Sequence, residues 1–426
     1  MKTFRLTALA LALVSTSSMA EISFALPSTN TTIKIGGYFN AGTHQRRGDR
    51  VDWDNMLARQ SAADYYQATA GNPSSTPGNI TAAKAQYDKV VAANPYWENL
   101  NTSASDIYFR LRLAAEQQVS SDLKVFGFFE RDFRTKRDDF RGQHVTDGDD
   151  DVTRRAFIGL EGDFGQLRFG RDESAMDYVR DLLYLPIEKD HYEYHVLVQP
   201  ISAMGRHDNS VIYRYDTARF GITAGAAFKS QEDFVSESSH SISARYVALP
   251  GLTFAAGYVG GELKTDTEGS IIQPNLNFMG LSAWDVSQVF EAAAYNPRFK
   301  LDQRQANIGV SYASGPFSIG ATVFRGRYKL GVNGEDVNRA GSATASEFDT
   351  RGGQASVRYA VNDKLSVAAL YTRSKNTTTD FSLVDVASLA VVYNLTPQAL
   401  LYGSVGRDSS DAAKATVGNV GIRFGF

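Results

Sequence analysis

Apolar and polar side chains alternate one by one along many segments of this chain. In the last segment, residues 416–426, branched and aromatic residues occupy every second position, with Asn, Gly and Arg between them. A period of two residues is that of a β-strand with two different faces. The apolar face of this strand would be formed by Val420, Ile422, Phe424 and Phe426. The pattern therefore predicts a C-terminal strand with one oily face and one hydrated face.

The same alternation recurs along the chain and predicts a protein built of strands. Its clearest other apolar positions are Ile107, Phe109, Leu111 and Leu113; Val211, Tyr213 and Tyr215; Ile242, Ala244 and Tyr246; Ile308, Val310 and Tyr312; and Ala355, Val357, Tyr359 and Val361. The positions between them include Arg, Asn, Ser and Gln, which need water. We expect about sixteen strands, at 31–43, 105–119, 122–134, 152–163, 166–172, 207–217, 219–228, 239–249, 252–263, 304–313, 316–327, 351–361, 364–373, 383–394, 398–406 and 414–426.

The connections between these strands are of two alternating kinds. Tight turn signals occur at Ser120-Ser121-Asp122, Pro250-Gly251 and Ser314-Gly315-Pro316, among others. Long polar loops lie between them, at about 44–104, 135–151, 173–206, 229–238, 264–303, 328–350, 374–382 and 407–413. Short turns at one end and long loops at the other are typical of outer-membrane barrels. A β-sandwich would not sort its loop lengths in this way.

The first twenty residues have the three parts of a secretory signal. Lys2 and Arg5 are positive, residues 6–14 are an apolar run too short to span a bilayer, and small residues surround Met19. We expect cleavage after Ala20, with Ala25 as the alternative. Residues 1–20 would then be a signal peptide, and residues 21–426 a single barrel domain with a long first loop at about 44–104.

Composition narrows the possible classes. The 426 residues include no Cys, which excludes disulfides, thiolate zinc sites and Cys nucleophiles. The net charge is −3, so the chain lacks the basic footprint of a nucleic-acid-binding protein. No stretch beyond the signal offers the roughly 18 consecutive apolar residues of a membrane helix. We therefore predict an all-β, transmembrane antiparallel barrel around a watery lumen; the alternative is a large secreted β-domain.

The chain resembles the general porins of Gram-negative bacteria, the trimeric sixteen-stranded family, over its whole mature length. The resemblance rests on TIKIGGYFNAG at 32–42, RAFIGLEGDFGQLRFGR at 155–171 and the terminal VGIRFGF. It implies short periplasmic turns, long extracellular loops, a third loop folded into the barrel, a homotrimer, and passive diffusion of small hydrophilic solutes without a cofactor. Phe424 and Phe426 resemble the signal read by the outer-membrane assembly machinery. The first loop, of about sixty residues, is longer than the family usually has there.

Charged residues are candidates for a constriction of the pore. On the resemblance, residues 172–206 fold inward, and their acids are Glu173, Asp177, Asp181, Glu188, Asp190 and Glu193. The basic residues expected on the facing wall are Lys34, Arg110, Arg112, Lys124, and Arg154 or Arg155. Alternation alone does not decide which of the last two points inward. An acidic loop opposite a basic wall would set up a field that selects ions, although its sign stays open. The plainer alternative is solvated loop acids and rim arginines.

Weaker candidates lie in the loops. His191 and His195, with Glu188, could share a helical face, and the acidic run 147–151 could hold Ca²⁺ or bridge to lipopolysaccharide phosphates. Neither has the spacing of a known metal motif, so we expect no metal. Residues 81–94 predict a short helix with Thr81 as its N-cap, which would cap the outer mouth or a neighbouring subunit. An extended surface loop is the alternative.

Other functions are compatible with a barrel. Barrel enzymes use ten to twelve strands, and this chain has six His but no GxSxG elbow, so we do not expect an enzyme. A sugar-selective channel would need lumen aromatics; Phe126, Phe128, Tyr108 and Tyr184 are candidates, although packing in a girdle or loop is the favoured interpretation. The outer loops could also serve adhesion. The expected partners are outer-membrane lipid and lipopolysaccharide, the assembly machinery, further copies of the chain and small solutes.

Overall fold

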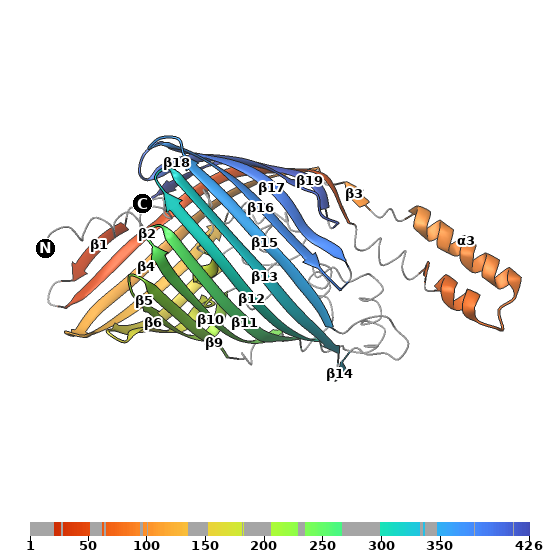
Figure 1. Cartoon of the computed structure of the whole chain (residues 1–426), viewed down its shortest axis with the longest axis horizontal. Coiled ribbons are helices and arrows are strands. Elements are labelled where there is room, and N and C mark those ends of the chain that lie inside the picture. The colour runs from red at the N-terminus through yellow and green to blue at the C-terminus, as the bar shows by residue number, and fades with distance from the viewer. Residues whose placement is uncertain are drawn as a thin grey trace.

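The polypeptide forms a closed β-barrel (Figure 1). The computed structural model describes residues 21–26, 29–51, 62–63, 65–93, 97–99, 101–134, 152–180, 182, 206–228, 235–265, 299–332, 335–336, 347–378, 380–411 and 413–426. Its sixteen wall strands are β2 (Thr31–Val51), β4 (Thr102–Ser120), β5 (Leu123–Arg134), β6 (Val152–Gly162), β7 (Gly165–Glu173), β8 (Arg206–Asp216), β9 (Phe220–Ala227), β10 (Val235–Leu249), β11 (Leu252–Thr265), β12 (Phe299–Ser314), β13 (Phe317–Val332), β15 (Glu347–Ala360), β16 (Leu365–Asn376), β17 (Phe381–Asn394), β18 (Ala399–Asp408) and β19 (Ala413–Gly425). Each pairs antiparallel with the next, and β19 returns to pair with β2. The predicted fold class and strand number are confirmed.

Most strands extend beyond their predicted ends at the side of the long loops. β2 continues to Val51 because its last residues still pair with β19 and with the short β3 (Trp97–Asn99). The loops expected at 374–382 and 407–413 shrink to residues 377–380 and 409–412. Polar and charged residues at these ends hid the strands from the alternation pattern, yet their backbones still pair. The connections at the opposite end, such as residues 121–122 and 250–251, are tight turns as predicted.

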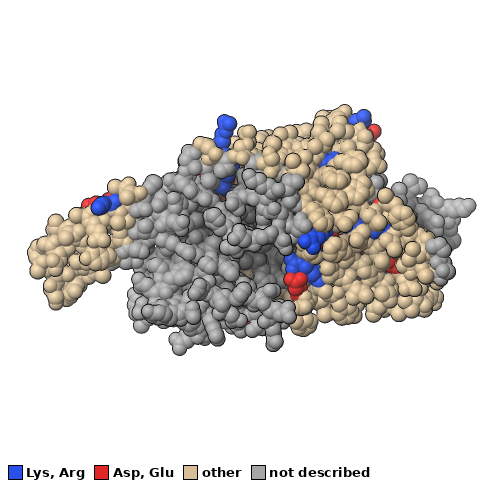
Figure 2. All heavy atoms as spheres, turned by 180° about the vertical axis from the view of Figure 1, so that it is seen from behind, with Lys and Arg blue, Asp and Glu red and all other residues tan. Residues whose placement is uncertain are grey.

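The two faces of the wall differ in the way the alternation predicts. Outward positions are large and apolar: Ile308, Leu389 and Val420 are each more than 60% exposed. Inward positions on the same strands are polar and buried, for example Gln303, Gln305 and Asn307 on β12 and Thr372, Ser374 and Asn376 on β16. Seen from behind, the described outer wall is mostly uncharged (tan in Figure 2). An oily exterior and a hydrated interior are what a membrane-spanning barrel requires.

The seam between β19 and β2 is locked by the last residue of the chain. The backbone of Phe426 exchanges two hydrogen bonds with Gly37, at 3.0 and 3.1 Å. Its ring stacks on Phe109 at 5.6 Å and lies 5.7 Å from Phe39. Gly37 has no side chain, which leaves the space that the Phe426 ring fills. Below this point, β1 (Glu21–Leu26) pairs with the start of β2 and prolongs the ladder.

A helical segment belongs to the first loop. α3 (Pro77–Ala93) lies beyond the end of the barrel in Figure 1. The prediction of Thr81 as N-cap is wrong: the helix begins four residues earlier, where the Thr76 hydroxyl accepts from the Asn79 amide at 3.2 Å and Pro77 occupies the first turn. The earlier start was hidden by the Pro and Gly residues around it. None of the described helices is long and apolar enough to cross a membrane.

Replacing Gly37 by Ala should weaken closure of the barrel. The added methyl group would overlap the carbonyl oxygen of Arg110 and come within 2.9 Å of the Phe426 ring. Overpacking of this kind costs about 1–3 kcal/mol. We expect a lower urea midpoint and less of the heat-modifiable folded form on electrophoresis. Gly403→Ala on β18 is the control, because its methyl group would meet only the Asn419 carbonyl oxygen at 3.5 Å. Equal behaviour of the two variants would contradict a locked seam.

Candidate functional site

The inner wall formed by β4, β5 and β6 carries a largely buried network of arginines and carboxylates, in which Arg112 alone of the three arginines described next is partly exposed. Arg110 donates to both oxygens of Asp132, with 2.8 Å between Nη2 and Oδ2. Arg112 donates from Nε to Glu130 at 2.6 Å. Arg154 reaches both carboxylates, at 2.8 Å to Glu130 and 3.3 Å to Asp132. Each acid is therefore shared by two arginines, and the three arginines become one rigid unit.

A β-bulge decides the orientation of the two adjacent arginines. Glu130 of β5 pairs with Arg155 of β6, but the next residue, Arg131, pairs with Thr153. Arg154 is the extra residue of the bulge, so both arginines turn toward the lumen side. Arg155 donates to Asp172 of β7 at 2.7 Å, and Arg168 donates to the same carboxylate at 3.1 Å. The question that alternation left open is resolved, because a bulge breaks the period of two.

The remaining two predicted wall residues form a separate group near the short turns. Lys34 lies 3.3 Å from Glu116, and Lys124 lies 3.0 Å from Glu161 and 3.6 Å from Glu116. These side chains are about one-quarter to one-third exposed, as are Arg112 and Arg155, so water screens them more than the buried Arg110 and Arg154. The structure thus gathers the four predicted arginines into one region and places the two lysines apart from them.

The acids that hold the arginines were not identified in the sequence. Glu130, Asp132 and Asp172 are at most 4% exposed and lie on the strands themselves. Glu130 and Asp132 lie two residues apart on β5, directly opposite Arg112 and Arg110 on β4. The pairing of these side chains could have been predicted once the register of the two strands was known. Of the predicted acidic loop, Glu173 ends β7, and the backbone of Asp177 begins α4 (Asp177–Arg180). Asp181, Glu188, Asp190 and Glu193 lie outside the described residues.

Aromatic side chains line the same wall beside the arginines. Phe128 stacks on Phe157 at 5.5 Å, and Phe126 meets Phe157 edge-on at 6.2 Å. The Arg155 guanidinium lies over both Phe128 and Phe157, at 4.9 and 5.2 Å. Tyr108 is also directed inward and is only 1% exposed. The girdle interpretation is therefore wrong for Phe126, Phe128 and Tyr108, whereas Tyr184 lies outside the described residues.

The chain turns into the barrel directly after β7. The amide of Ala175 donates to the Ser241 hydroxyl at 2.9 Å, and the Ser243 hydroxyl donates to the carbonyl of Ala175. Met176, Tyr178, Val179 and Leu182 then pack with Ala255 and Val259 in one buried cluster. Glycines on the wall make room for this segment: Met176 lies over Gly257 and Leu182 over Gly309. The inward fold is confirmed for residues 174–180 and for Leu182.

An ionic cluster anchors the same segment to the wall. The Tyr178 hydroxyl donates to Asp216, which also accepts from Arg214 at 2.5 Å and from Arg245 at 2.9 Å. Both guanidiniums lie over the Tyr178 ring, at 5.0 and 5.4 Å. Burial, and then the bond to Asp216, raise the pKa of Tyr178, so it stays protonated and keeps donating. The inward segment thus rests on β8–β12, the strands that follow β7 in the sheet beyond the arginine network.

The described part of the chain offers no support for a metal site. Among these residues, the structure contains no group of three His, Asp or Glu side chains arranged to hold a metal ion. His191, His195, Glu188 and the acidic run 147–151 lie outside the described residues.

Comparison with known proteins identifies the family. The model of the Gram-negative porin family matches residues 6–413. The chain belongs to the Gram-negative porins. A porin-like protein L of Photobacterium profundum is 24% identical over 254 residues, which cover 57% of this chain and 69% of that protein. An outer membrane porin protein OmpD of Citrobacter koseri is 24% identical over 294 residues, 69% of this chain and 63% of that protein. This porin therefore lies in the outer membrane.

Solved structures support the same fold. OmpT of Vibrio cholerae, in a form described as a trimer, superposes with a TM-score of 0.57 at 16% identity. The match covers 93% of this porin and 99% of that chain. The match shows that the two chains share the barrel fold. The match says nothing of the charged side chains on the inner wall, which are known from the structure of this porin alone.

Replacing Arg112 by Gln should shift ion selectivity toward cations. It removes one inward positive charge, while Glu130 keeps its bond to Arg154. The shift in reversal potential should be larger in 0.1 M than in 1 M KCl, because the Debye length falls from about 10 Å to about 3 Å. Arg327→Gln is the matched control: Arg327 shares Asp349 with Arg325 in the same way but is 61% exposed and faces outward. Identical potentials for both variants and the unmodified porin would place Arg112 outside the ion path.

Proposed function

We propose that this porin is a water-filled channel through which small hydrophilic solutes and ions diffuse passively. The observation that carries the proposal is the reversal of polarity across the wall: outward faces are apolar, and inward faces carry Ser, Thr, Asn, Gln and paired charges. Charged side chains on a lipid-facing surface would cost roughly 2–4 kcal/mol each at mid-depth, whereas a hydrated lumen accommodates them. Sixteen strands are also enough to enclose an aqueous lumen.

The constriction in this proposal lies between the arginine network and the inward segment. Arg110, Arg112, Arg154 and Arg155 form the basic side, with Lys34 and Lys124 nearer the short turns. Glu173, Asp177, Asp181, Glu188, Asp190 and Glu193 form the acidic side contributed by the third loop. The anchors at Ser241, Ser243 and Asp216 support this arrangement, because they bring the start of the loop inside the barrel. Such a transverse field would orient dipolar solutes and exclude apolar ones.

A second candidate, a saccharide-selective channel, is favoured by one observation. Phe126, Phe128 and Phe157 form an inward aromatic patch with Arg155 across it. Sugar rings stack their apolar faces on aromatic rings, while guanidinium groups donate to hydroxyl oxygens. An enzymatic role receives no comparable support, since barrel enzymes have ten to twelve strands and this barrel has sixteen.

Liposome swelling and single-channel recording test the channel directly. We expect the purified porin to admit uncharged sugars up to a size limit and to give steady, ohmic conductance steps in planar bilayers. Vesicles that contain inserted, heat-modifiable protein yet remain impermeable to small sugars and salts would overturn the proposal. A stepwise block of the current by low concentrations of a linear oligosaccharide, but not by a polyol of similar mass, would favour the saccharide-selective candidate.

We also propose that the porin functions as a homotrimer. The similar OmpT of Vibrio cholerae is described in a trimer form. In this chain, Phe39, Phe109, Phe133 and Phe426 form a stacked aromatic group on the outward face of β2, β4, β5 and the C-terminus. Such a flat, exposed group is suited to a contact between copies.

Phe39→Ser should therefore lower the trimer fraction on native electrophoresis. Phe39 is 54% exposed and contacts two other rings of the aromatic group, Phe109 and Phe426. Tyr246→Ser on β10 is the control, because Tyr246 is 52% exposed but lies away from the group. Heat-modifiability shows whether each variant has folded. A stable monomer of the unmodified porin would contradict the trimer.

A further inference from the structure

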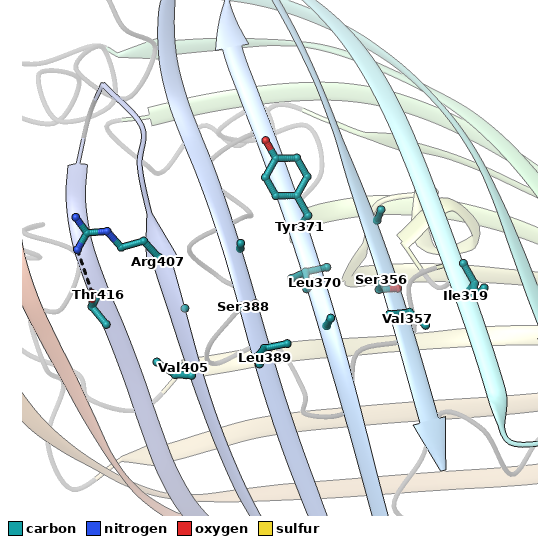
Figure 3. Close-up of a pocket in the computed structure, with 14 residues that line it drawn as sticks. Ile319, Ser356, Val357, Leu370, Tyr371, Ser388, Leu389, Val405, Arg407 and Thr416 are labelled. Atoms are coloured by element: carbon teal, nitrogen blue, oxygen red, sulfur yellow. Dashed lines mark hydrogen bonds between the residues drawn. The ribbon is translucent and has the colours of Figure 1, made fainter. Parts of the chain in front are cut away.

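The inner wall carries an aromatic patch, formed by Phe126, Phe128 and Phe157 of β5 and β6. All three side chains are partly exposed. The outer wall also has an apolar hollow, of about 650 Å³, across β13 and β15–β19 (Figure 3). An apolar surface is expected there, because the outside of the barrel faces the hydrocarbon of the membrane. Exposed rings on a hydrated inner wall have no such reason, so the aromatic patch calls for a solute with an apolar part.

The register of the sheet places the aromatic patch between two charged rows. Phe128 lies directly opposite Phe157, and Arg155 follows one row nearer the long loops. Phe126 lies one row nearer the short turns, and Lys124 follows one row beyond it. Rows that point the same way are two residues, or about 7 Å, apart along a strand. The apolar interval between the charges is therefore comparable in length to a benzene ring with a carboxyl group.

The guanidinium group of Arg155 covers part of the aromatic patch. It lies over the rings of Phe128 and Phe157, at 4.9 and 5.2 Å from their centroids. Its Nε donates to Asp172 at 2.7 Å, which holds the group in place. Within the described part of the chain, the two terminal nitrogens of Arg155 have no hydrogen-bond acceptor, and the side chain is 24% exposed. These nitrogens are therefore available to an anionic solute.

Arg168 makes the same end of the aromatic patch more positive. Its guanidinium lies 5.2 Å from the Phe157 centroid and donates to Asp172 at 3.1 Å and to Gln166 at 2.7 Å. Arg155 and Arg168 thus share one carboxylate, which leaves this group with a charge of +1. In the neighbouring network, three arginines share two carboxylates, which leaves another +1. An anion is therefore attracted to this end of the patch.

The end of the aromatic patch nearer the short turns has the opposite balance of charge. Two lysines face three glutamates there, namely Lys34 and Lys124 against Glu21, Glu116 and Glu161. Their side chains are 26–53% exposed, so water screens them. The two ends therefore favour one orientation of an amphipathic anion, with its charge toward Arg155 and its apolar part toward the short turns.

We propose that the aromatic patch, together with Arg155 and Arg168, binds aromatic carboxylates on their way through the channel. The carboxylate accepts from the terminal nitrogens of Arg155, and the ring of the solute lies against Phe126. Guanidinium groups suit this occupant because they stack on aromatic rings and donate two parallel hydrogen bonds to a carboxylate. A saccharide fits less well, because the Arg155 guanidinium already covers the rings of Phe128 and Phe157 on which a sugar would stack. This inference rests on the channel function proposed above.

Binding and conduction are measured separately with two anions, phenylacetate and acetate, at neutral pH. Saturation-transfer NMR of each anion with the purified, detergent-solubilised porin gives its binding without any need for conduction. Half-blocking concentrations of the KCl current in planar bilayers then report binding inside the channel. We expect phenylacetate to bind and to block at concentrations about twofold to tenfold lower than acetate, the factor that one aromatic contact contributes.

Two variants separate the ring contact from the charge contact. Phe126→Leu keeps an apolar side chain but removes the ring, so phenylacetate should bind about twofold to tenfold more weakly while acetate binding stays the same. Arg155→Lys keeps the positive charge but loses the planar group, so the preference for phenylacetate over acetate should fall. Phe324→Leu is the matched control, because Phe324 of β13 packs against Val384 and Val386 of β17, away from the aromatic patch. Heat-modifiability shows that each variant has folded.

The outcomes distinguish this site from the channel itself. Equal binding of phenylacetate and acetate by a conducting porin would overturn the site and leave the channel standing. An unchanged preference in both Phe126→Leu and Arg155→Lys would do the same. Binding of phenylacetate that both variants weaken, by a porin that gives no conductance steps, would keep the site and overturn the channel. Tighter binding of a linear oligosaccharide than of phenylacetate, lost in Phe126→Leu, would assign the aromatic patch to sugars and overturn the inference.

Discussion

The hydrocarbon core of a membrane offers no water to an unpaired peptide group, and this constraint governs the structure. Each open strand edge would leave a row of N–H and C=O groups unsatisfied at several kcal/mol apiece. The chain meets the constraint by returning β19 to β2, and the last residue completes the ladder through Gly37. The C-terminal strand is thus the piece without which fifteen correctly paired strands would still present two exposed edges. Burial of the aromatic ring over a glycine adds packing to the hydrogen bonds.

Closure in turn forces the side chains to sort. Every second residue must face lipid, so charged residues within the membrane depth are directed inward, where they need water or partners. The arginines of β4 and β6 find both, since Glu130 and Asp132 each serve two guanidiniums. Removing one of these acids takes an ion-pair partner from two arginines at once, although Arg154 keeps the other acid, and such a loss inside the wall costs more than the loss of a surface contact. The shared ion pairs therefore hold the guanidinium groups of the inner wall in fixed positions.

Much of the barrel could be predicted from the sequence, because alternation is a local property of each strand. The faces of Ile107 to Leu113 and of Val420 to Phe426 followed from spacing alone. Properties that depend on register could not be predicted: the partners of Arg110 and Arg112 are set by which residue of β5 lies opposite. The bulge at Arg154 and the start of α3 at Pro77 also escaped, because each departs from a regular period or propensity. The inward turn after β7 was expected from the family resemblance. The glycines that make room for it, Gly257 and Gly309, could be recognised only from the structure.

The bulge at Arg154 of β6 shows how the inner wall of such a barrel can change in evolution. The insertion resets the phase of the strand, so positions on either side of it keep their orientation toward oil or solvent. A lineage can therefore gain or lose a guanidinium in the channel by a single-codon insertion or deletion, without redesigning any turn. The fields inside these barrels can in this way diversify faster than the scaffolds that enclose them.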